Sequence, residues 1–414
     1  MVNARYRLPA LLLLFLLYFG AAFSQKASVD FRQAANDHNS SSLGNVVWIN
    51  SILQQNNAVY YEGMSVPQRI MLTGIPARTG NFHTLTFSHL ASKNGKHAWD
   101  FLTSYSQAMA AANAIAGPTV LVNLNSCGPS IGPPSSMAST CATILAGPYS
   151  YNVDIPDAMG TVLSHSVASA VTNYETRFGN RTLTLYGNAA ITSATLMFTG
   201  YSGSNDKMAN YTLYWTSTSS SILVQFAGHL AMGVDVQGAG TGIGYGSGFG
   251  AGSISGAPFH FKLGSLNGSS LGSQDNQISG NAIRTSIACS MTGANPACAG
   301  TQNVYSFSTT LSGLSYAWSL TSNSSGASIV GSTSGQSVTV HAGNGTGGYT
   351  VNVAVSDGVQ TVNCSYPVIV NGVSATASHT PIGCAGGMST VTVSASGGVP
   401  PYTGTGTFSK PAGT

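Results

Sequence analysis

The chain is short of charge. Asp, Glu, Lys and Arg make up only 6% of its 414 residues, against about 25% in a typical soluble domain, and glutamate occurs only at Glu62 and Glu175. The 14 basic and 11 acidic residues give a net charge of +3. Disordered tails and nucleic-acid binders depend on charge, and coiled coils and helical bundles are rich in Glu and Lys. The sequence argues against all of these classes, and we expect no nucleic-acid partner.

Long apolar runs are also missing, except at the N-terminus. Arg5 and Arg7 precede an apolar run over residues 8–19, and Ala22 and Ser24 suit a cleavage site. This pattern describes a secretory signal peptide over residues 1–24, because the run is shorter than the ~20 residues of a membrane anchor. We therefore expect a secreted or cell-surface, extracellular protein with no transmembrane helix after cleavage.

Glycine and hydroxyl residues take the place of the missing charge. Glycine alone accounts for 50 residues, and short runs in which apolar and polar residues alternate end at glycines, a pattern typical of β-strands. Such runs cover residues 45–50, 58–63, 68–74, 82–90, 181–187, 190–201, 210–217, 221–232 and 258–266. The fold class predicted is all-β, with tandem β-sandwiches.

The first predicted domain is a large β-sandwich over residues 45–285, preceded by a linker over residues 25–44. Residues from about 100 to 180 form an insertion in it. One helix is expected over residues 100–116, capped by Asp100, and a second over residues 157–174, with a Gly/Pro/Ser-rich loop between them. From Gly238 to Gly252 every second residue is glycine, so one side of an extended chain would lack side chains, and the run is either closely packed or mobile.

A second domain is predicted over residues 286–372. Cys298, Trp318 and Cys364 are spread over short alternating strands, which is the pattern of an immunoglobulin-like (Ig-like) sandwich with the tryptophan packed on the disulfide. Residues 373–414 begin a third β unit of only about 40 residues, which rarely supports its own core. We interpret this unit as a partial repeat and the chain as truncated.

Six cysteines in an exported chain suggest disulfides. The first pairing expected is Cys127 with Cys141, across the Gly/Pro/Ser-rich loop, and the second is Cys298 with Cys364. Cys289 is an alternative partner of Cys364. The pairing of Cys289 and Cys384 stays open at this stage.

Two groups of polar residues stand out in so uncharged a chain. The first is interpreted as a structural polar cluster of residues that satisfy one another's hydrogen bonds. The second contains weaker candidates for a metal site, since Asp oxygen suits Ca²⁺ and His nitrogen suits Zn²⁺, although no metal-binding spacing is present. The first group is Glu62, Arg69, His83, His97 and Asp100, and the second is His229, Asp235, His260 and Asp275.

No motif predicts a cofactor or a catalytic residue. No phosphate-binding loop occurs, and both GxSxG matches, at residues 128–132 and 268–272, lack the strand and helix that a nucleophile elbow requires. Four tyrosines are candidates for stacking on sugars, although strand tyrosines more often pack inside a sheet. They are Tyr60, Tyr61, Tyr201 and Tyr245.

Three stretches resemble known families. Residues 45–284, with EGMSVPQR, GKHAWDFLT and GHLA…SISGAPFH, resemble a domain at the start of large exported bacterial surface proteins. Residues 286–372 are similar to Ig-like repeats of secreted Bacteroidetes proteins. CAGGMSTVTVSASGGVPPYTGTGTF resembles the first part of an SprB-type repeat of gliding-motility adhesins. These resemblances imply a Gram-negative source and export by the type IX system, although the usual C-terminal sorting domain is missing.

These observations favour a non-enzymatic adhesin-like or structural protein that presents a β-sandwich tip on Ig-like repeats. Extracellular polysaccharide or surface proteins are its expected partners. A glycan- or calcium-binding module is the alternative, and an exported hydrolase is a second one, which would require paired carboxylates in a cleft.

Overall fold

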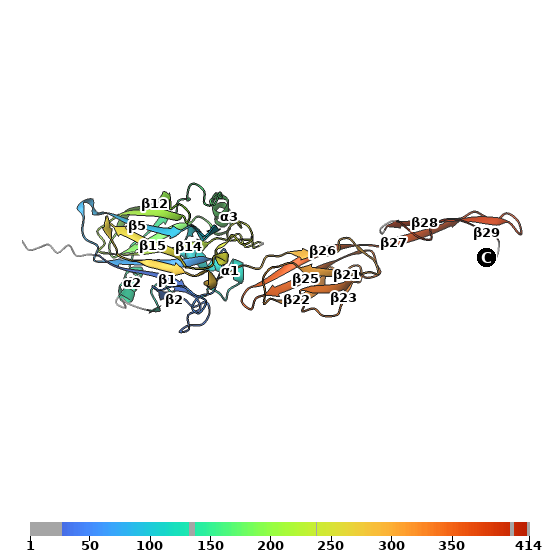
Figure 1. Ribbon diagram of the computed structural model, residues 1–414, viewed down its shortest axis with the longest axis horizontal. Helices are drawn as coiled ribbons and strands as arrows, with labels where there is room; N and C mark the ends of the chain where they lie inside the picture. The colour runs from blue at the N-terminus through green and yellow to red at the C-terminus, as the bar shows by residue number, and fades with distance from the viewer. Residues whose placement is uncertain (1–26, 132–136, 237, 398–400, 412–414) are drawn as a thin grey trace, which may run out of the picture.

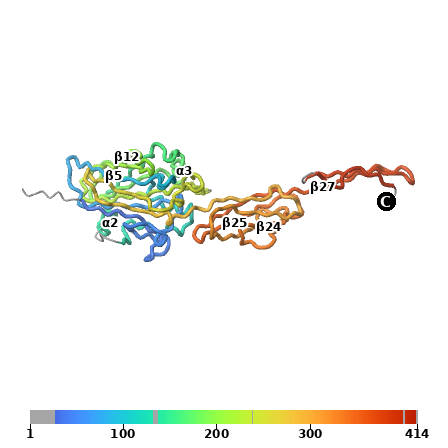
Figure 2. The backbone as a smooth tube through the Cα atoms, viewed as in Figure 1, coloured from blue at the N-terminus to red at the C-terminus, as the bar shows by residue number. Residues whose placement is uncertain are grey.

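The computed structural model describes residues 27–131, 137–236, 238–397 and 401–411, so the predicted signal peptide lies outside the described part. Three β units follow one another along the long axis of the molecule (Figures 1 and 2). The predicted all-β class with tandem sandwiches is confirmed. Within the described residues, no helix has the length and apolar character needed to cross a bilayer.

The first domain consists mainly of two sheets. The described part of the larger sheet has eight strands, with β8 (Trp99–Thr103) paired to β14 beside the main order. That order is β10 (Ser150–Asp154), β11 (Thr182–Gly187), β14 (Ser221–Leu230), β4 (Ser65–Thr73), β1 (Ser28–Ala35), β2 (Val47–Ile49), β9 (Ser130–Ile131). The smaller sheet runs β12 (Ile191–Ser202), β13 (Met208–Ser217), β5 (Phe82–Leu90), β15 (Phe259–Leu266), β16 (Ser269–Ser270), with β17 (Asp275–Ile278) also on β15.

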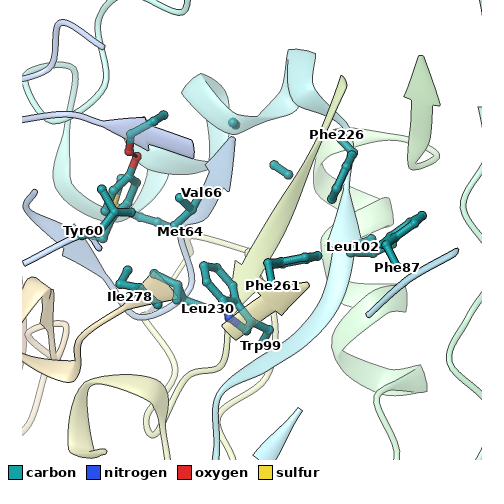
Figure 3. Close-up of a cluster of buried hydrophobic side chains, with 14 of the residues drawn as sticks. Tyr60, Met64, Val66, Phe87, Trp99, Leu102, Phe226, Leu230, Phe261 and Ile278 are labelled. Atoms are coloured by element: carbon teal, nitrogen blue, oxygen red, sulfur yellow. Dashed lines mark hydrogen bonds between the residues drawn. The ribbon is translucent and has the colours of Figure 1, made fainter. Parts of the chain in front are cut away.

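The core of this domain lies between the two sheets. Burial alternates strictly along β13 and almost strictly along β5, because successive side chains of a strand point to opposite faces. Aromatic side chains from both sheets meet there (Figure 3): Phe87 of β5 lies 5.3 Å from Phe226 of β14, measured between ring centroids, and Phe261 of β15 lies 5.3 Å from Trp99 of β8. The large hydrophobic area of these rings dominates the packing.

The linker expected over residues 25–44 is wrong, because its middle forms β1. This strand lies between β4 and β2 in the larger sheet, and residues 30–35 are all buried. Asp30, Arg32 and Gln33 give this segment the polar composition of a linker, although all three side chains are buried. Only its pairing with two neighbouring strands shows that it is a central strand.

Both helices predicted in the insertion begin too early. Residues 99–103 form β8, so Asp100 is a strand residue and not a helix cap, and α1 starts only at Ala108 (Ala108–Ala116). All five residues of β8 are buried, and a strand buried on both faces lacks the alternation that identifies strands. The second helix, α3, spans Ala168–Phe178, and the loop predicted between the two helices contains a further helix, α2 (Met137–Leu145).

Two short pairs of strands complete the first domain. β6 (Ser92–Lys93) and β7 (Lys96–His97) form a hairpin, and β3 (Tyr60–Tyr61) pairs in parallel with β18 (Ile283–Arg284). Because β18 is the last strand before the second domain, the β3–β18 pair ties the exit of the chain to the interior of the first domain.

The second domain is an Ig-like sandwich. Trp318 and Cys364 belong to one buried cluster between its sheets, and each stands opposite Val353 in the strand order. One sheet consists of β19 (Met291–Thr292), β21 (Gln302–Phe307), β24 (Ser337–His341) and β23 (Ser328–Val330). The other consists of β20 (Ala297–Cys298), β26 (Thr361–Asn371), β25 (Gly347–Ser356) and β22 (Ser315–Thr321).

The Cys127–Cys141 disulfide is confirmed, with 5.5 Å between the Cα atoms. The predicted Cys298–Cys364 bond is wrong: Cys289 bonds to Cys364, and Cys298 is free. Cys298 stands opposite Asn371 of β26, seven residues beyond Cys364, which is about 23 Å along a strand. Since a disulfide spans at most ~6.8 Å between Cα atoms, the register of β20 excludes the predicted pair.

The third unit is a single sheet of three strands among the residues described: β27 (Val373–His379), β28 (Met388–Gly397) and β29 (Gly406–Pro411). Every residue of β27 and β29 is exposed, and the free Cys384 lies between β27 and β28. No second layer of described residues covers this sheet.

We expect the substitution Cys289→Ser to destabilise the Ig-like domain strongly, because the bond closes a chain separation of 75 residues. The loop-closure model gives a loss of roughly 4 kcal/mol in the free energy of unfolding. Urea unfolding of the full chain measures this loss, and Cys298→Ser is the matched control, with a small expected effect. A larger loss for Cys298→Ser than for Cys289→Ser would contradict the assigned pairing.

Candidate functional site

The first two domains are joined by a polar contact at the end of β3. The Tyr61 hydroxyl donates to Asp357 of the second domain, with 2.8 Å between Oη and Oδ2, and Arg284 Nη1 lies 3.2 Å from the same oxygen. Tyr61 is fully buried. Burial works against the ionised Asp357 carboxylate, but backbone N–H groups, Tyr61 and Arg284 together hold its pKa below the usual range. The charge of Asp357 therefore stabilises the contact between the domains.

Gln360 of the second domain completes this junction. Its side chain has no solvent exposure; Nε2 donates to the Ile115 carbonyl of α1 at 2.6 Å, and Oε1 accepts from the Ile287 N–H at 2.8 Å. Its backbone N–H donates to the Tyr61 hydroxyl at 3.2 Å. Gln360 thus bonds both the first domain and Ile287 at the start of its own domain. Separating the domains would leave several buried polar groups without partners.

A cleft of about 460 Å³ opens beside the junction. Its walls come from Val234 and the glycine run of the first domain, from residues 285–290 and from the loop after β21. Seven of the ten lining residues carry hydroxyls, and none is charged: Val234, Ser247, Thr285, Ser286, Ala288, Ser290, Ser308, Thr309, Thr310 and Leu311. The cleft is suited to an uncharged ligand that exchanges hydrogen bonds with hydroxyl groups.

The glycine run and the neighbouring Gly233 pack against the buried carboxylate of Glu62. Glu62 Oε2 accepts from the Gly233 N–H at 2.8 Å, and Oε1 accepts from the Gly252 N–H at 2.9 Å. A Cβ atom on Gly250 would lie 2.3 Å from the Gly233 nitrogen and 2.4 Å from Glu62 Oε1. The absence of side chains therefore allows backbone and carboxylate to pack together. Burial raises the pKa of Glu62.

Asp100 connects the two groups of polar residues that stand out in the sequence. Its Oδ1 lies 2.6 Å from Nδ1 of His229, and its Oδ2 accepts from the Tyr245 hydroxyl at 3.2 Å. The Tyr245 ring stacks on His97 with a centroid distance of 3.8 Å. Phe101 stacks on the His229 ring at 4.2 Å, and Nε2 of His229 is buried without a partner. Asp100, His97 and His229 form one network, whereas the other predicted residues lie elsewhere.

The first group does not form the single structural cluster that was predicted. Its members are Glu62, Arg69, His83, His97 and Asp100. Only His97 and Asp100 meet, through Tyr245, while Glu62 bonds the glycine run. His83 lies against Trp215 and Asn267. Each residue does have the structural partners that the interpretation required, but strand order distributes them over separate parts of the domain.

The second group, proposed as weaker metal candidates, also separates. Nδ1 of His229 bonds Asp100, and Nδ1 of His260 lies 2.8 Å from Asp275 Oδ2. Asp235 accepts from the Gly244 N–H. In the described ranges, no three His, Cys, Asp or Glu residues gather in a way that would hold a metal ion. Asp100, Asp235 and Asp275 have separate partners, so these contacts do not make an acid pair.

A buried ion network around Arg69 was not anticipated. Arg32 Nε lies 2.7 Å from Asp30 Oδ1, and Arg69 Nη2 lies 3.4 Å from Asp30 Oδ2; all three side chains are buried. Arg69 also donates to the Ser126 carbonyl at 2.9 Å, and burial lowers its pKa to about 10. Apolar and charged residues alternate from Val29 to Arg32, and this alternation is the sequence pattern that could have predicted the strand.

The four candidate sugar-stacking tyrosines are largely internal. Tyr60 and Tyr61 are fully buried, and Tyr60 donates to the Ala34 carbonyl at 2.7 Å. Tyr201 is half-buried and packs on Phe198 at 5.0 Å, and Tyr245 belongs to the Asp100 network.

No protein-family model matches the chain, and no curated protein matches it. Similar solved structures include Escherichia coli α-2-macroglobulin (7% identity, 88% of this chain, 24% of that chain, TM-score 0.18). Another is the endo-fucoidan hydrolase MfFcnA4 of glycoside hydrolase family 107 (9% identity, 55% of this chain, 41% of that chain, TM-score 0.15). A third is the structure of the N-terminal eight Ig domains of Down Syndrome Cell Adhesion Molecule (11% identity, 82% of this chain, 40% of that chain, TM-score 0.19). This chain spans less than half the length of each, and likeness at this level carries no argument about function.

We expect Gly250→Ala to destabilise the first domain by about 3 kcal/mol, because the added methyl group overlaps backbone and carboxylate in a packed interior. Gly248→Ala is the matched control within the same run. Its Cβ would meet no atom within 4 Å, and its φ of +82° adds only the ~1 kcal/mol of left-handed strain. Thermal and urea unfolding measure the loss of stability in both variants. Equal effects of the two substitutions would show that the run is not closely packed around Glu62.

Proposed function

We propose that this is a non-enzymatic secreted or cell-surface protein of adhesin-like or structural type. In this proposal the Ig-like domain and the exposed sheet after it form a stalk, and the first β-sandwich is the tip. Extracellular polysaccharides or other surface proteins are the partners that such a tip would meet.

The observation that carries this proposal is the junction between the first two domains. A tip is useful for contact at a distance only if its stalk transmits force and orientation. Domains joined by a bare linker move independently, whereas here Tyr61, Asp357 and the fully buried Gln360 cross the boundary with hydrogen bonds and ion pairs. A buried junction of this kind favours two domains that move together.

Two further features support an extracellular setting. Both disulfides are of the kind that persists in oxidising compartments. With 6% charged residues, the surface provides little long-range electrostatic steering. Contact would therefore depend on shape, hydroxyl groups and amides, as suits uncharged extracellular polymers.

A second candidate function is the binding of a neutral glycan, favoured by the hydroxyl-lined cleft at the domain boundary. Hydroxyl side chains donate and accept hydrogen bonds, as sugar hydroxyls do. Ligand sites often lie at domain interfaces and have volumes of ~300–1,000 Å³, and the cleft has about 460 Å³. The absence of charge in its lining argues against an acidic or basic ligand.

The junction predicts that Gln360→Ala will loosen the two domains. The variant removes the bonds to the Ile115 carbonyl and the Ile287 N–H, each contributing about 1 kcal/mol, so we expect the Ile287 amide to exchange its hydrogen about ten-fold faster or more. Hydrogen exchange followed by mass spectrometry or NMR measures this. Gln336→Ala is the matched control, because Gln336 is exposed and bonds only Phe307 within the Ig-like domain.

An unchanged Ile287 exchange rate in Gln360→Ala would contradict the junction as a coupling element. Small-angle scattering of the wild-type chain provides a second measure: a profile that requires independent motion of the first two domains would remove the support for a stalk. Antibodies to the first domain should label intact producing cells or their medium, and labelling only after lysis would overturn the proposed location.

The glycan candidate predicts that neutral hexasaccharides bind at the cleft. Maltohexaose, cellohexaose and hexa-N-acetylchitohexaose serve as probes in calorimetry, and Thr309→Trp should abolish binding by filling the cleft. Thr195→Trp, at an exposed position of β12, is the matched control. Absence of binding by all three probes, or binding retained in Thr309→Trp, would remove this candidate without affecting the stalk.

A further inference from the structure

Two histidines far apart in the sequence converge at the edge of the Asp100 network. His97 ends β7 and is buried, while His165 lies on an exposed turn before α3. His97 Nε2 and His165 Nδ1 are 3.4 Å apart, and the two rings meet edge to face at 68°. Neither the predicted polar cluster nor the proposed stalk assigns a role to this pair.

The turn that carries His165 has a strained backbone. Val162 and His165 pair with each other through two backbone hydrogen bonds of 2.9 Å, and the residues between them, Leu163 and Ser164, have φ values of 48° and 67°. Glycine and asparagine favour this left-handed conformation, and leucine and serine do not. Strain of this kind often accompanies functional positioning, and here the turn places the His165 ring over His97.

The Asp100 network fixes the orientation of the His97 ring. Tyr245 stacks on its ring, and the Tyr245 hydroxyl is anchored on Asp100, which is itself bonded to His229. The imidazole therefore keeps one orientation, with Nε2 toward His165.

We propose that His97 Nε2 and His165 Nδ1 together bind one divalent transition-metal ion, Zn²⁺ or Cu²⁺. Two nitrogens bound to a tetrahedral Zn²⁺ at ~2.0–2.1 Å lie about 3.4 Å from each other, which equals the separation in this structure. Imidazole is a preferred ligand of Zn²⁺, Cu²⁺ and Ni²⁺, and oxygen-seeking Ca²⁺ and Mg²⁺ are disfavoured. Since no third His, Cys, Asp or Glu of the described chain joins the pair, water completes the coordination.

A support shell behind the ligand distinguishes this pair from two histidines that meet by chance. Metal-binding histidines are usually oriented by a hydrogen bond to the second ring nitrogen. Here the stacked Tyr245 ring, whose hydroxyl donates to Asp100, orients His97 instead. His165 faces solvent, so an ion reaches the site without opening the domain. The exposed position also means that substituting His165 leaves the core intact.

The test is a titration of the full chain, prepared without a polyhistidine tag, with ZnCl₂ in a buffer that does not bind metals. Calorimetry should show one site in the wild type that weakens about ten-fold or more in His165→Ala. His379→Ala is the matched control, because His379 is an exposed histidine of β27 in the third unit. Its removal should leave the affinity of this site unchanged.

Electron paramagnetic resonance with one equivalent of Cu²⁺ provides a second measurement, with hyperfine coupling to two imidazole nitrogens in the wild type and not more than one in His165→Ala. Thermal unfolding of both proteins without metal confirms that His165→Ala is folded. Absence of Zn²⁺ binding by the wild type, or equal binding by the wild type and His165→Ala, would overturn the proposal. Neither result would affect the proposed stalk.

Discussion

A polar group taken out of water needs a partner, and this constraint governs the first domain because the chain has so few charges to place. Six charged side chains of its described residues are buried, and several of them join segments that are distant in the sequence. Asp30 and Arg69 fasten the disulfide loop to the larger sheet, and Asp100 links β8, β14 and the glycine run. In a β-sandwich whose surface is mostly hydroxyl, amide and glycine, these contacts specify which loops lie together.

The short strand β3 shows how closely the parts depend on one another. Tyr60 bonds β1, Tyr61 bonds Asp357 of the Ig-like domain, and Glu62 accepts a hydrogen bond from Gly252 of the glycine run. Three successive residues thus contact the larger sheet, the Ig-like domain and the loop that borders the cleft. Displacement of β3 would disturb all three regions at once, because their buried hydrogen bonds have no alternative partners nearby. The junction and the interior of the first domain are therefore parts of one polar framework.

Local patterns were a good guide where a strand has one buried face. The alternation in β5 and β13, the Ig-like arrangement around Trp318, and the Cys127–Cys141 bond all follow from neighbouring residues. Patterns failed where both faces are buried. β8 lacks alternation and was interpreted as a helix, and β1 carries Asp30 and Arg32 inward and was interpreted as a linker. In both cases the environment, which the local sequence does not contain, decides the conformation.

By itself the sequence determined the all-β class, the Ig-like second domain and the shortage of charge, because these depend on composition and on short-range periodicity. Only the tertiary structure decided which polar residues share a site. His97 meets His165 and Asp100 meets His229, while Glu62, Arg69 and His83 lie apart. It also decided that Cys289, and not Cys298, reaches Cys364. The physical reason is strand order and register: a disulfide or a shared ion requires atoms within a few ångströms, and in a sheet that proximity is set by pairing between distant strands.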